Sequence, residues 1–445
     1  MLTRACLTTI ALLMTMPAWT QALPTATAGT EIPDEYRMPI PPMASGQAFP
    51  TTSLSESRSN YLDSGLSFQP SYDDNLLPDN GTHTIGDMAY SIRPMIELDR
   101  LTPRLHQTWA YQPGFTIYQK TSARNEADQN ASLALQYRLS EHATVSGQES
   151  FLRSSNVLNQ PESLSGGPIS GSPPSSPADI IAPFADTLTN TANAEVAYQF
   201  SMNGMVGAGV TTAIHNYPNQ TQSSSLYNSN SRGGSAFYNR RLFGTQYIGV
   251  TYQYLKTLGN PQTGQLEIHT HTIFPFYTAF LGHAFSLSLA AGPQYFSYNQ
   301  PPLPMSRSWT PAVMGSVGWQ TERTSLAASY SRTVSGGGGL LGAMSTNSAS
   351  ASTTWRMTRT WNVGSTAHYS IYKNKSPSSL SPSSGGHSVS GTVTIDHALS
   401  DHLRMEVGYQ RLHQSYSSIA AITSDPDADS EFVSISYQFT RPLGR

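Results

Sequence analysis

Three residues with metal-binding side chains stand at alternate positions of the sequence: Glu267, His269 and His271. Imidazole nitrogens and carboxylate oxygens are common ligands of zinc and related transition metals. In a β-strand, side chains two residues apart project from the same face. The spacing predicts that the three groups share one strand face near an outer mouth. There they form either part of a metal shell or, as the simpler interpretation, a polar lumen lining.

Enzyme motifs are missing from the sequence. It contains no Gly-x-Ser-x-Gly nucleophile elbow, no Walker A phosphate loop and no His-Glu-x-x-His zinc motif. A hydrolase would have to pair its scattered serine and histidine residues in space. We therefore expect no catalytic site, no cofactor and no enzymatic activity.

The composition narrows the class of protein. Only 12% of the 445 residues are charged, whereas soluble proteins carry about a quarter. The formal net charge of -3 argues against a nucleic-acid-binding protein, which would be basic. A single cysteine excludes an internal disulfide framework.

The amino-terminal segment has the pattern of an export signal. Arg4 precedes an apolar run over 5–16, and Thr20-Gln21-Ala22 offers small residues for cleavage. Residues 1–22 are therefore expected to be a signal peptide. The stretch 23–58 is rich in Pro, Thr and Ser and is expected to be a disordered periplasmic linker. No later run of about 18 apolar residues exists, so any membrane span must be a β-strand.

From residue 59 onward, apolar and polar residues alternate. Ile248, Val250, Tyr252 and Tyr254, for example, are separated by Gly, Thr and Gln. This period of two predicts strands with one apolar and one polar face. About eighteen such segments can be marked, with sixteen as the alternative count: 59–75, 86–101, 104–118, 129–140, 143–156, 188–201, 205–217, 231–243, 246–258, 264–280, 283–298, 307–320, 324–335, 346–357, 361–373, 387–398, 402–414 and 430–440.

The lengths of strands and connections favour a membrane barrel. A tilted strand needs about ten residues to climb an apolar band of ~25 Å, and the marked segments reach that length. Short turns alternate with longer loops, the arrangement of short periplasmic turns and longer extracellular loops in membrane barrels. We predict that residues 59–445 form an all-β, transmembrane, antiparallel β-barrel. A soluble β-sandwich or solenoid is the alternative, but its strands are shorter.

Two further segments carry a resemblance to a known family. The chain ends its last strand with Val433-Ser-Ile-Ser-Tyr-Gln-Phe439, similar to the aromatic-ended signal read by the outer-membrane assembly machinery, although Thr440–Arg445 follow it. Tyr72-Asp73-Asp74-Asn75 is similar to a feature near the start of barrels in the "β-barrel porin 2" group. The sequence thus resembles Gram-negative outer-membrane porins. The resemblance implies location in the bacterial outer membrane and passage of small hydrophilic solutes or ions by passive diffusion.

Ionisable residues on the polar strand faces are the candidates for lining such a channel. A charge on the lipid-facing side near the midplane would cost about 2–4 kcal/mol, so these side chains are expected to point inward. Their signs are mixed, which predicts no strong ion selectivity. The candidates are Ser71, Asp73, Arg93, Glu97, Arg138, Glu195, Arg404 and Glu406.

The stretch 157–187 is long for a connection and carries only acidic charges, at Glu162, Asp179 and Asp186. It resembles, in order and acidity, the constriction loop of general porins. We hypothesise that it narrows the pore opposite Arg93 or Arg138; a surface loop is the alternative.

The expected partners follow from this interpretation. They are outer-membrane lipid and lipopolysaccharide, the barrel-assembly machinery, periplasmic chaperones and small solutes, but not nucleic acid. Because porins are often trimers, a homotrimer is one option. The alternative to a channel is a non-conducting barrel that serves structure, docking or polysaccharide export.

Overall fold

The computed structural model describes residue 38 and the ranges 60–75, 85–154, 186–218, 226–261, 264–282, 284–301, 304–337, 341–375, 385–417 and 427–443. Among these residues, no helix has the length and apolar character needed to cross a membrane. The segment predicted as a signal peptide lies outside the described residues, as does the predicted linker except for Met38.

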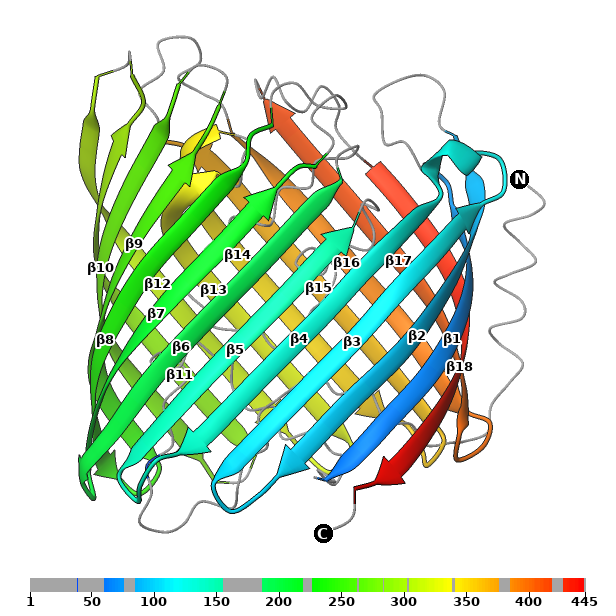
Figure 1. The fold of residues 1–445 in the computed structure, drawn as a ribbon, viewed down its shortest axis with the longest axis horizontal. Helices are drawn as coiled ribbons and strands as arrows, with labels where there is room; N and C mark the ends of the chain where they lie inside the picture. Colours follow the sequence, from blue (N-terminus) through cyan, green and yellow to red (C-terminus); the bar gives the residue numbers. More distant parts are fainter. Residues whose placement is uncertain are drawn as a thin grey trace.

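Eighteen strands and one short 3-10 turn, η1 (Ser122–Arg124), make up the regular structure of the described chain (Figure 1). The strands are β1 (Tyr61–Asp73), β2 (Asp87–Leu101), β3 (Leu105–Tyr118), β4 (Glu126–Arg138), β5 (Ala143–Ser154), β6 (Thr187–Ser201), β7 (Gly204–Asn216), β8 (Ser229–Phe243), β9 (Gln246–Gly259), β10 (Leu266–Leu281), β11 (Phe285–Asn299), β12 (Ser306–Gln320), β13 (Thr324–Gly337), β14 (Leu341–Arg356), β15 (Trp361–Asn374), β16 (Gly385–Ala398), β17 (Leu403–Ser417) and β18 (Asp427–Pro442).

These strands form one closed antiparallel barrel. Each strand pairs with its neighbours in the chain, and β1 also pairs with β18 through a register that begins at Tyr61 and Pro442. The predicted all-β barrel and its count of eighteen strands are confirmed, and the alternative of sixteen is not observed. Every predicted segment corresponds to one strand; the main boundary difference is β14, which begins five residues earlier than expected, at Leu341.

The residues of the extracellular motif Tyr72–Asn75 close this seam. The backbone N–H of Asp74 donates to the carbonyl of Asp429 at 3.0 Å, and Asp74 Oδ1 accepts a bond from the Asp429 N–H at 2.8 Å. Asn75 Nδ2 donates to the carbonyl of Asp427 at 2.8 Å. The motif therefore joins β1 to β18 where the first and last strands meet.

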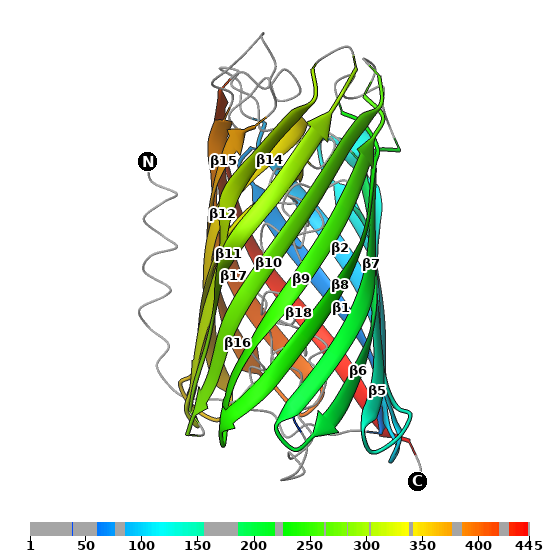
Figure 2. The same ribbon diagram turned by 90° about the vertical axis from the view of Figure 1, so that its left-hand side faces the viewer.

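The two ends of the barrel differ. At one end, the connections run from two residues (202–203) to four (139–142), and β1 starts and β18 ends there. At the other end, the connections are mostly longer, for example 74–86 and 217–228. Figure 2 shows the strands crossing the wall obliquely between these ends. By the layout of outer-membrane barrels, the short-turn end is periplasmic and the long-loop end extracellular.

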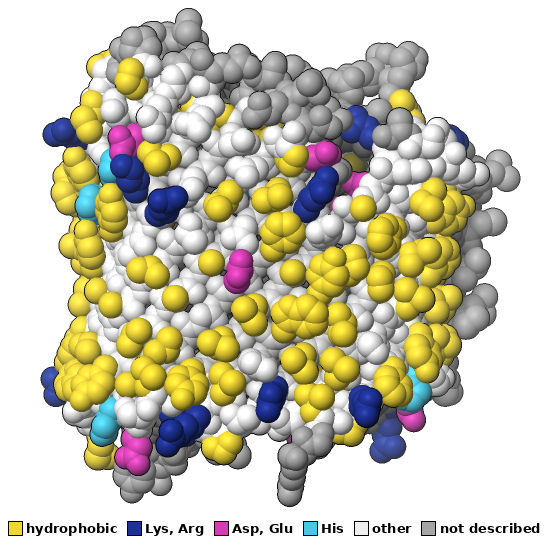
Figure 3. Space-filling view, in the orientation of Figure 1, with side chains coloured by type: hydrophobic (Ala, Val, Ile, Leu, Met, Phe, Trp, Pro, Cys, Tyr) yellow, Lys and Arg dark blue, Asp and Glu magenta, His cyan; other side chains and the backbone are white. Residues whose placement is uncertain are grey.

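The outer face carries the apolar half of each strand. On β18, Val433, Ile435, Tyr437 and Phe439 are exposed to the outside. Figure 3 shows apolar side chains spread over the middle of this surface, with most charged side chains near its upper and lower edges. Exposed aromatic residues also lie near the short-turn ends: Tyr137, Tyr198, Trp319, Trp355 and Tyr437. This is the surface of a lipid-facing barrel with an interfacial aromatic girdle.

Candidate functional site: the lumen of the barrel

The inward-facing charged residues gather on one side of the lumen. Alternation along each strand turns them away from exposed outer residues such as Phe68, Ile92 and Val407. We call this surface the charged wall; it spans β16, β17, β18 and β1–β4, which are consecutive around the barrel. Its ionisable residues include Asp63, Asp73, Asp87, Arg93, Glu97, Asp99, Glu126, Asp128, Arg138, Asp396, Arg404 and Glu406. Carboxyl side chains outnumber guanidinium groups on it.

Arg93 is the central cation of the charged wall. It interacts electrostatically with Asp128, Glu126 and Glu406, and its Nη1 donates to Gln69 Oε1 at 3.2 Å. Gly114 of β3 lies between Arg93 on β2 and Asp128 on β4. A Cβ atom added to Gly114 would be 3.6 Å from Arg93 Cγ and 3.4 Å from Asp128 Cβ. Gly114 therefore lies directly between these two side chains.

A second group lies on β16 and β17. Glu406 and Asp396 are cross-strand partners whose carboxyl groups share a hydrogen bond. Arg404 interacts electrostatically with Asp396 and with Asp63 of β1. Because Arg93 also interacts electrostatically with Glu406, the two groups form one continuous polar surface across the seam between β18 and β1. Glu97 joins this surface as the register partner of Asp63. The structure thus brings together four residues that the sequence marked separately: Arg93, Glu97, Arg404 and Glu406.

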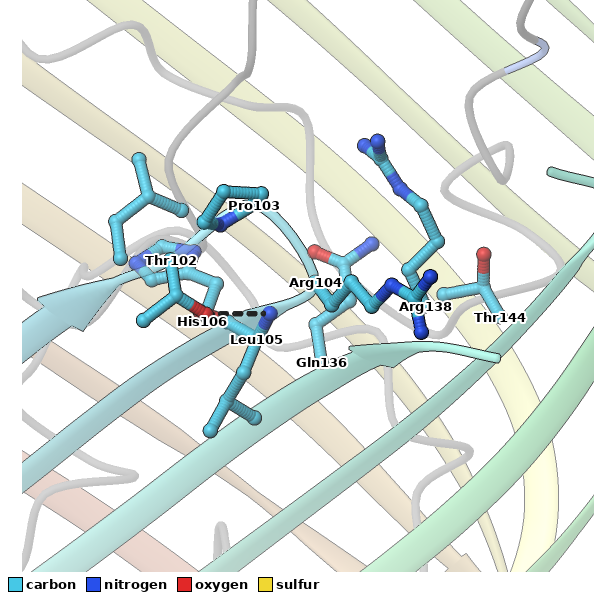
Figure 4. A pocket seen from close by; sticks show the side chains of 9 residues that line it. Thr102, Pro103, Arg104, Leu105, His106, Gln136, Arg138 and Thr144 are labelled. Carbon is cyan, nitrogen blue, oxygen red and sulfur yellow. Dashed lines mark hydrogen bonds between the residues drawn. The ribbon is translucent and has the colours of Figure 1, made fainter. Parts of the chain in front are cut away.

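The remaining predicted lining residues lie apart from this central cluster. Asp73 is buried at the extracellular end of β1, next to the seam, and Ser71 precedes it on the same inward face. Arg138 ends β4 at the short-turn mouth, beside a small notch lined also by Thr102, Gln136 and Thr144. In Figure 4 this notch lies at the β2–β3 turn, where the Leu105 N–H donates to Thr102 Oγ1 at 3.0 Å. Glu195 points inward from β6, away from the charged wall.

The opposite side of the lumen carries an apolar cluster. Buried inward side chains of β6–β12 form a cluster of Ala197, Met205, Phe237, Tyr247, Phe274, Phe276, Ala290 and Ala312. Met38 packs on this cluster with only 3% of its surface exposed, and its N–H donates to Gln199 Oε1 at 3.1 Å. One residue of the predicted linker therefore lies inside the barrel.

A hairpin formed by the upper parts of β13 and β14 also enters the lumen. β13 pairs with β12 only as far as Arg332, although both strands continue beyond that point. Past Arg332, Val334 binds the side chain of Gln294 on β11: the Val334 N–H donates to Oε1 at 2.7 Å, and Nε2 donates to the Val334 carbonyl at 2.9 Å. Gly336 lies close against Thr257 of β9, since a Cβ atom added to Gly336 would be only 2.8 Å from Thr257 Cγ2. The yellow upper ends of these strands bend away from the wall in Figure 1.

This inward hairpin covers a second apolar cluster. Val334 and Ala343 pack with Leu266, Ile268, Phe296, Tyr298 and Tyr227. Tyr227 precedes β8 in the chain. Burial in this cluster raises the pKa of its hydroxyl, so the group stays protonated. The alternation of the sequence did not predict this hairpin. The available signal was a run of small residues from Ser335 to Gly339, which permits close packing against another strand.

The predicted constriction loop is largely untested. Glu162 and Asp179 lie outside the described residues, and Asp186 directly precedes β6. Within the described part of the chain, the element that enters the extracellular half of the lumen is the β13–β14 hairpin.

Glu267, His269 and His271 do share one strand face, but it is the outer face of β10. His271 pairs with Tyr254, and Ile273 with Tyr252, an exposed outer residue. The structure therefore does not support a lumen lining by these residues. The side chains are bonded to neighbours: His269 Nε2 donates to Glu267 Oε1 at 3.0 Å, and Glu267 also binds Lys256. No group of three or more His, Cys, Asp or Glu among the described residues is arranged to hold a metal ion.

Comparisons with known proteins yield structural neighbours only. No protein-family model matches the chain, and no curated protein matches its sequence. OpdK from Pseudomonas aeruginosa, solved with vanillate, has a TM-score of 0.40 and 10% identity, covering 85% of this chain and 99% of that one. OccAB4 from Acinetobacter baumannii has a TM-score of 0.39 and 9% identity over 87% of this chain and 100% of that one.

The FrpB iron transporter from Neisseria meningitidis has a TM-score of 0.40 and 9% identity, covering 86% of this chain and 82% of that one. The assignment of the fold rests on the strand topology of the chain itself. A closed barrel with an apolar outer band is the architecture of outer-membrane β-barrels, and this chain has that architecture.

Proposed function

We propose that the protein is an outer-membrane channel for passive diffusion of small hydrophilic solutes or ions, with a preference for cations. The observation that carries this proposal is the charged wall. Its carboxyl and guanidinium side chains turn into the lumen of an eighteen-stranded barrel, a size at which barrels can hold an aqueous channel. A fully packed core would not place so many ionisable groups along one continuous surface.

The mixed signs of the candidate residues predicted no strong ion selectivity. The preference for cations is inferred instead from the excess of carboxyl over guanidinium groups on the charged wall. Fixed charges lining a pore raise the local concentration of ions of opposite sign. Arg93, Arg138 and Arg404 offset only part of the acidic charge. The filtering is electrostatic and steric and involves no chemical step.

Planar bilayer recordings test the proposal. The purified protein should give discrete conductance steps, and a salt gradient at pH 8 should give a reversal potential of the sign expected for cations. A reversal potential of the opposite sign would contradict the electrostatic argument. A folded barrel without any conductance steps would reject the channel itself.

A second candidate function has its own support. Met38 and the β13–β14 hairpin both occupy the apolar side of the lumen, and occupancy of this kind is expected of a non-conducting barrel used for docking or export. The absence of conductance in a folded protein would favour this function. The similarity of Tyr72–Asn75 to the "β-barrel porin 2" group remains a prediction, as do the signal peptide and the homotrimer.

A further inference from the structure

The outer face of β8–β12 carries an ordered set of basic and aromatic side chains near the extracellular end. In the register of the sheet, Arg232 pairs with Lys256, Lys256 with His269, His269 with Ser297, and Ser297 with Arg307. Neighbouring strands are about 4.8 Å apart. This strip of side chains is basic except at Ser297, and we call it the basic row.

An aromatic row lies two residues closer to the short-turn end on the same strands. Tyr254 pairs with His271, His271 with Tyr295, and Tyr295 with Trp309. Their rings are in contact: the centroids of Tyr254 and His271 are 4.9 Å apart, and those of Tyr295 and Trp309 are 5.2 Å apart. Trp309 is 67% exposed. The apolar outer band, which includes Tyr252 and Ile273, begins below this row.

Hydrogen bonds hold the centre of the strip in place. The hydroxyl of Tyr254 and His269 Nδ1 share a bond of 2.8 Å, as do the hydroxyl of Tyr252 and His271 Nδ1. Glu267 binds both His269 and Lys256. The ammonium group of Lys256 is thereby fixed beside Arg232, with N–H donors remaining for a further acceptor.

Arg232 distinguishes this strip from other charged parts of the outer face. Like charges directly opposite each other destabilise a sheet, yet Arg232 faces Lys256 and has no carboxylate within ion-pair distance among the described residues. On β17, by contrast, outward Arg411 pairs with Asp427 and Asp429 at 3.2 and 3.4 Å. Arg411 is neutralised by the protein itself, whereas Arg232 is exposed and available to an anion from outside.

We propose that this strip binds the phosphorylated glycolipid of the outer leaflet, lipopolysaccharide. Arg232 and Lys256 bind a phosphate group, because a guanidinium and an ammonium on adjacent strands match its charge and size. Tyr295 and Trp309 face the sugar rings, and the apolar band below packs on the acyl chains. Figure 3 shows Lys or Arg, His and acidic side chains gathered at the upper left of the face, above apolar side chains.

The occupant is a membrane lipid because of where the strip lies. It is on the outside of the barrel wall, next to the apolar band, so it faces the lipid headgroups at the extracellular side and not the lumen. The inference requires the barrel to sit in the outer membrane, but it does not depend on conduction.

The test measures binding of diphosphorylated lipid A to the full-length protein in detergent by native mass spectrometry. Each basic residue near an anionic membrane surface contributes a factor of about five to binding, so R232A combined with K256A should weaken it about 30-fold. The matched control is R240A, an outward arginine on the same strand at the short-turn end, which should leave affinity unchanged. R232K retains the charge and should keep most of the binding.

Three results would overturn the proposal. One is equal binding by the double variant and the original protein. Another is equally tight binding of dephosphorylated lipid A, which would show that the phosphate is not recognised. The third is a loss in R240A as large as in the double variant, which would show attraction by overall charge only. Far-UV circular dichroism checks that all variants are folded; their changed side chains are at the protein surface.

Discussion

The hydrogen bonds between Gln294 and Val334 are the point at which the inward hairpin can be released. Gln294 is 4% exposed, and its amide satisfies both the N–H and the carbonyl of Val334. Substitution by leucine keeps the volume but removes both bonds. We expect Gln294→Leu to detach the β13–β14 hairpin from β11 and to widen the extracellular half of the lumen.

The magnitude follows from the two bonds. Each contributes about 1 kcal/mol net, and leaving buried backbone groups unsatisfied adds about 1–3 kcal/mol. A total of about 3 kcal/mol corresponds to an approximately 100-fold shift from the docked to the undocked hairpin. The apolar contacts of Val334 and Ala343 oppose release, so the variant should alternate between two states and should not remain permanently open.

Single-channel recordings measure this directly. Gln294→Leu should show a larger mean conductance and more frequent transitions than the original protein. Gln148→Leu on β5, an inward glutamine outside the hairpin region, is the matched control and should change neither. A truncation that joins Arg332 to Asn347, which are register partners, through an Asn-Gly turn should give the stable open state.

A truncated protein that is folded, conducts and has the conductance of the original would contradict a restricting role of the hairpin. In that case the hairpin would lie in the lumen without restricting it. If the conductance of Gln294→Leu is unchanged while that of the truncated protein is larger, the apolar contacts alone hold the hairpin.

Three further predictions concern other parts of the barrel. Glu149 is exposed on the outer face at the middle of β5 and accepts a hydrogen bond from Asn190 Nδ2 at 3.0 Å. Removing a charge from the lipid-facing surface should outweigh the loss of this bond, so Glu149→Leu should stabilise the barrel by about 1 kcal/mol. A urea-unfolding midpoint in vesicles that does not rise would contradict this. Residues 7–445 contain no cysteine, and Met38 and Ala197 belong to one cluster. The double variant Met38→Cys, Ala197→Cys should therefore cross-link through a short bis-maleimide. A protein that remains unlinked would place Met38 outside the lumen. Arg93→Gln removes a cation that faces three carboxyl groups and should increase the cation preference, measured as a larger reversal potential; a shift toward anions would contradict the proposed charged wall.

The position of the hairpin shows why local patterns are insufficient inside the lumen. Alternation continues through Val334 and Ser335 as it does in the wall, and nothing nearby in the sequence indicates that β13 leaves β12. The decisive partner is Gln294, forty residues away along the chain. Such long-range pairing depends on barrel closure, which fixes where β11 stands relative to β13.

The outward direction of His269 and His271 is a different case. They stand four and two residues before Ile273, an apolar residue of the outer face, so alternation puts all three on that face. The sequence therefore contained the signal for an outer location, but residue type suggested a polar lining. Near strand ends, alternation predicts the direction of a side chain better than residue type does. Polar side chains can face lipid headgroups there as well as the lumen.

The strands, their apolar faces and the inward direction of most central charged residues, with Glu149 as an exception, can be read from the sequence. Period-two alternation sets these, because lipid accepts one face of each strand and excludes charges near its midplane. Tertiary structure alone decided which charges meet. Arg93 and Glu406 are far apart in the chain, and they interact because the seam between β1 and β18 closes the barrel. Closure likewise brought Met38 and the hairpin onto the apolar side of the lumen, since buried side chains require a packing partner wherever the fold supplies one.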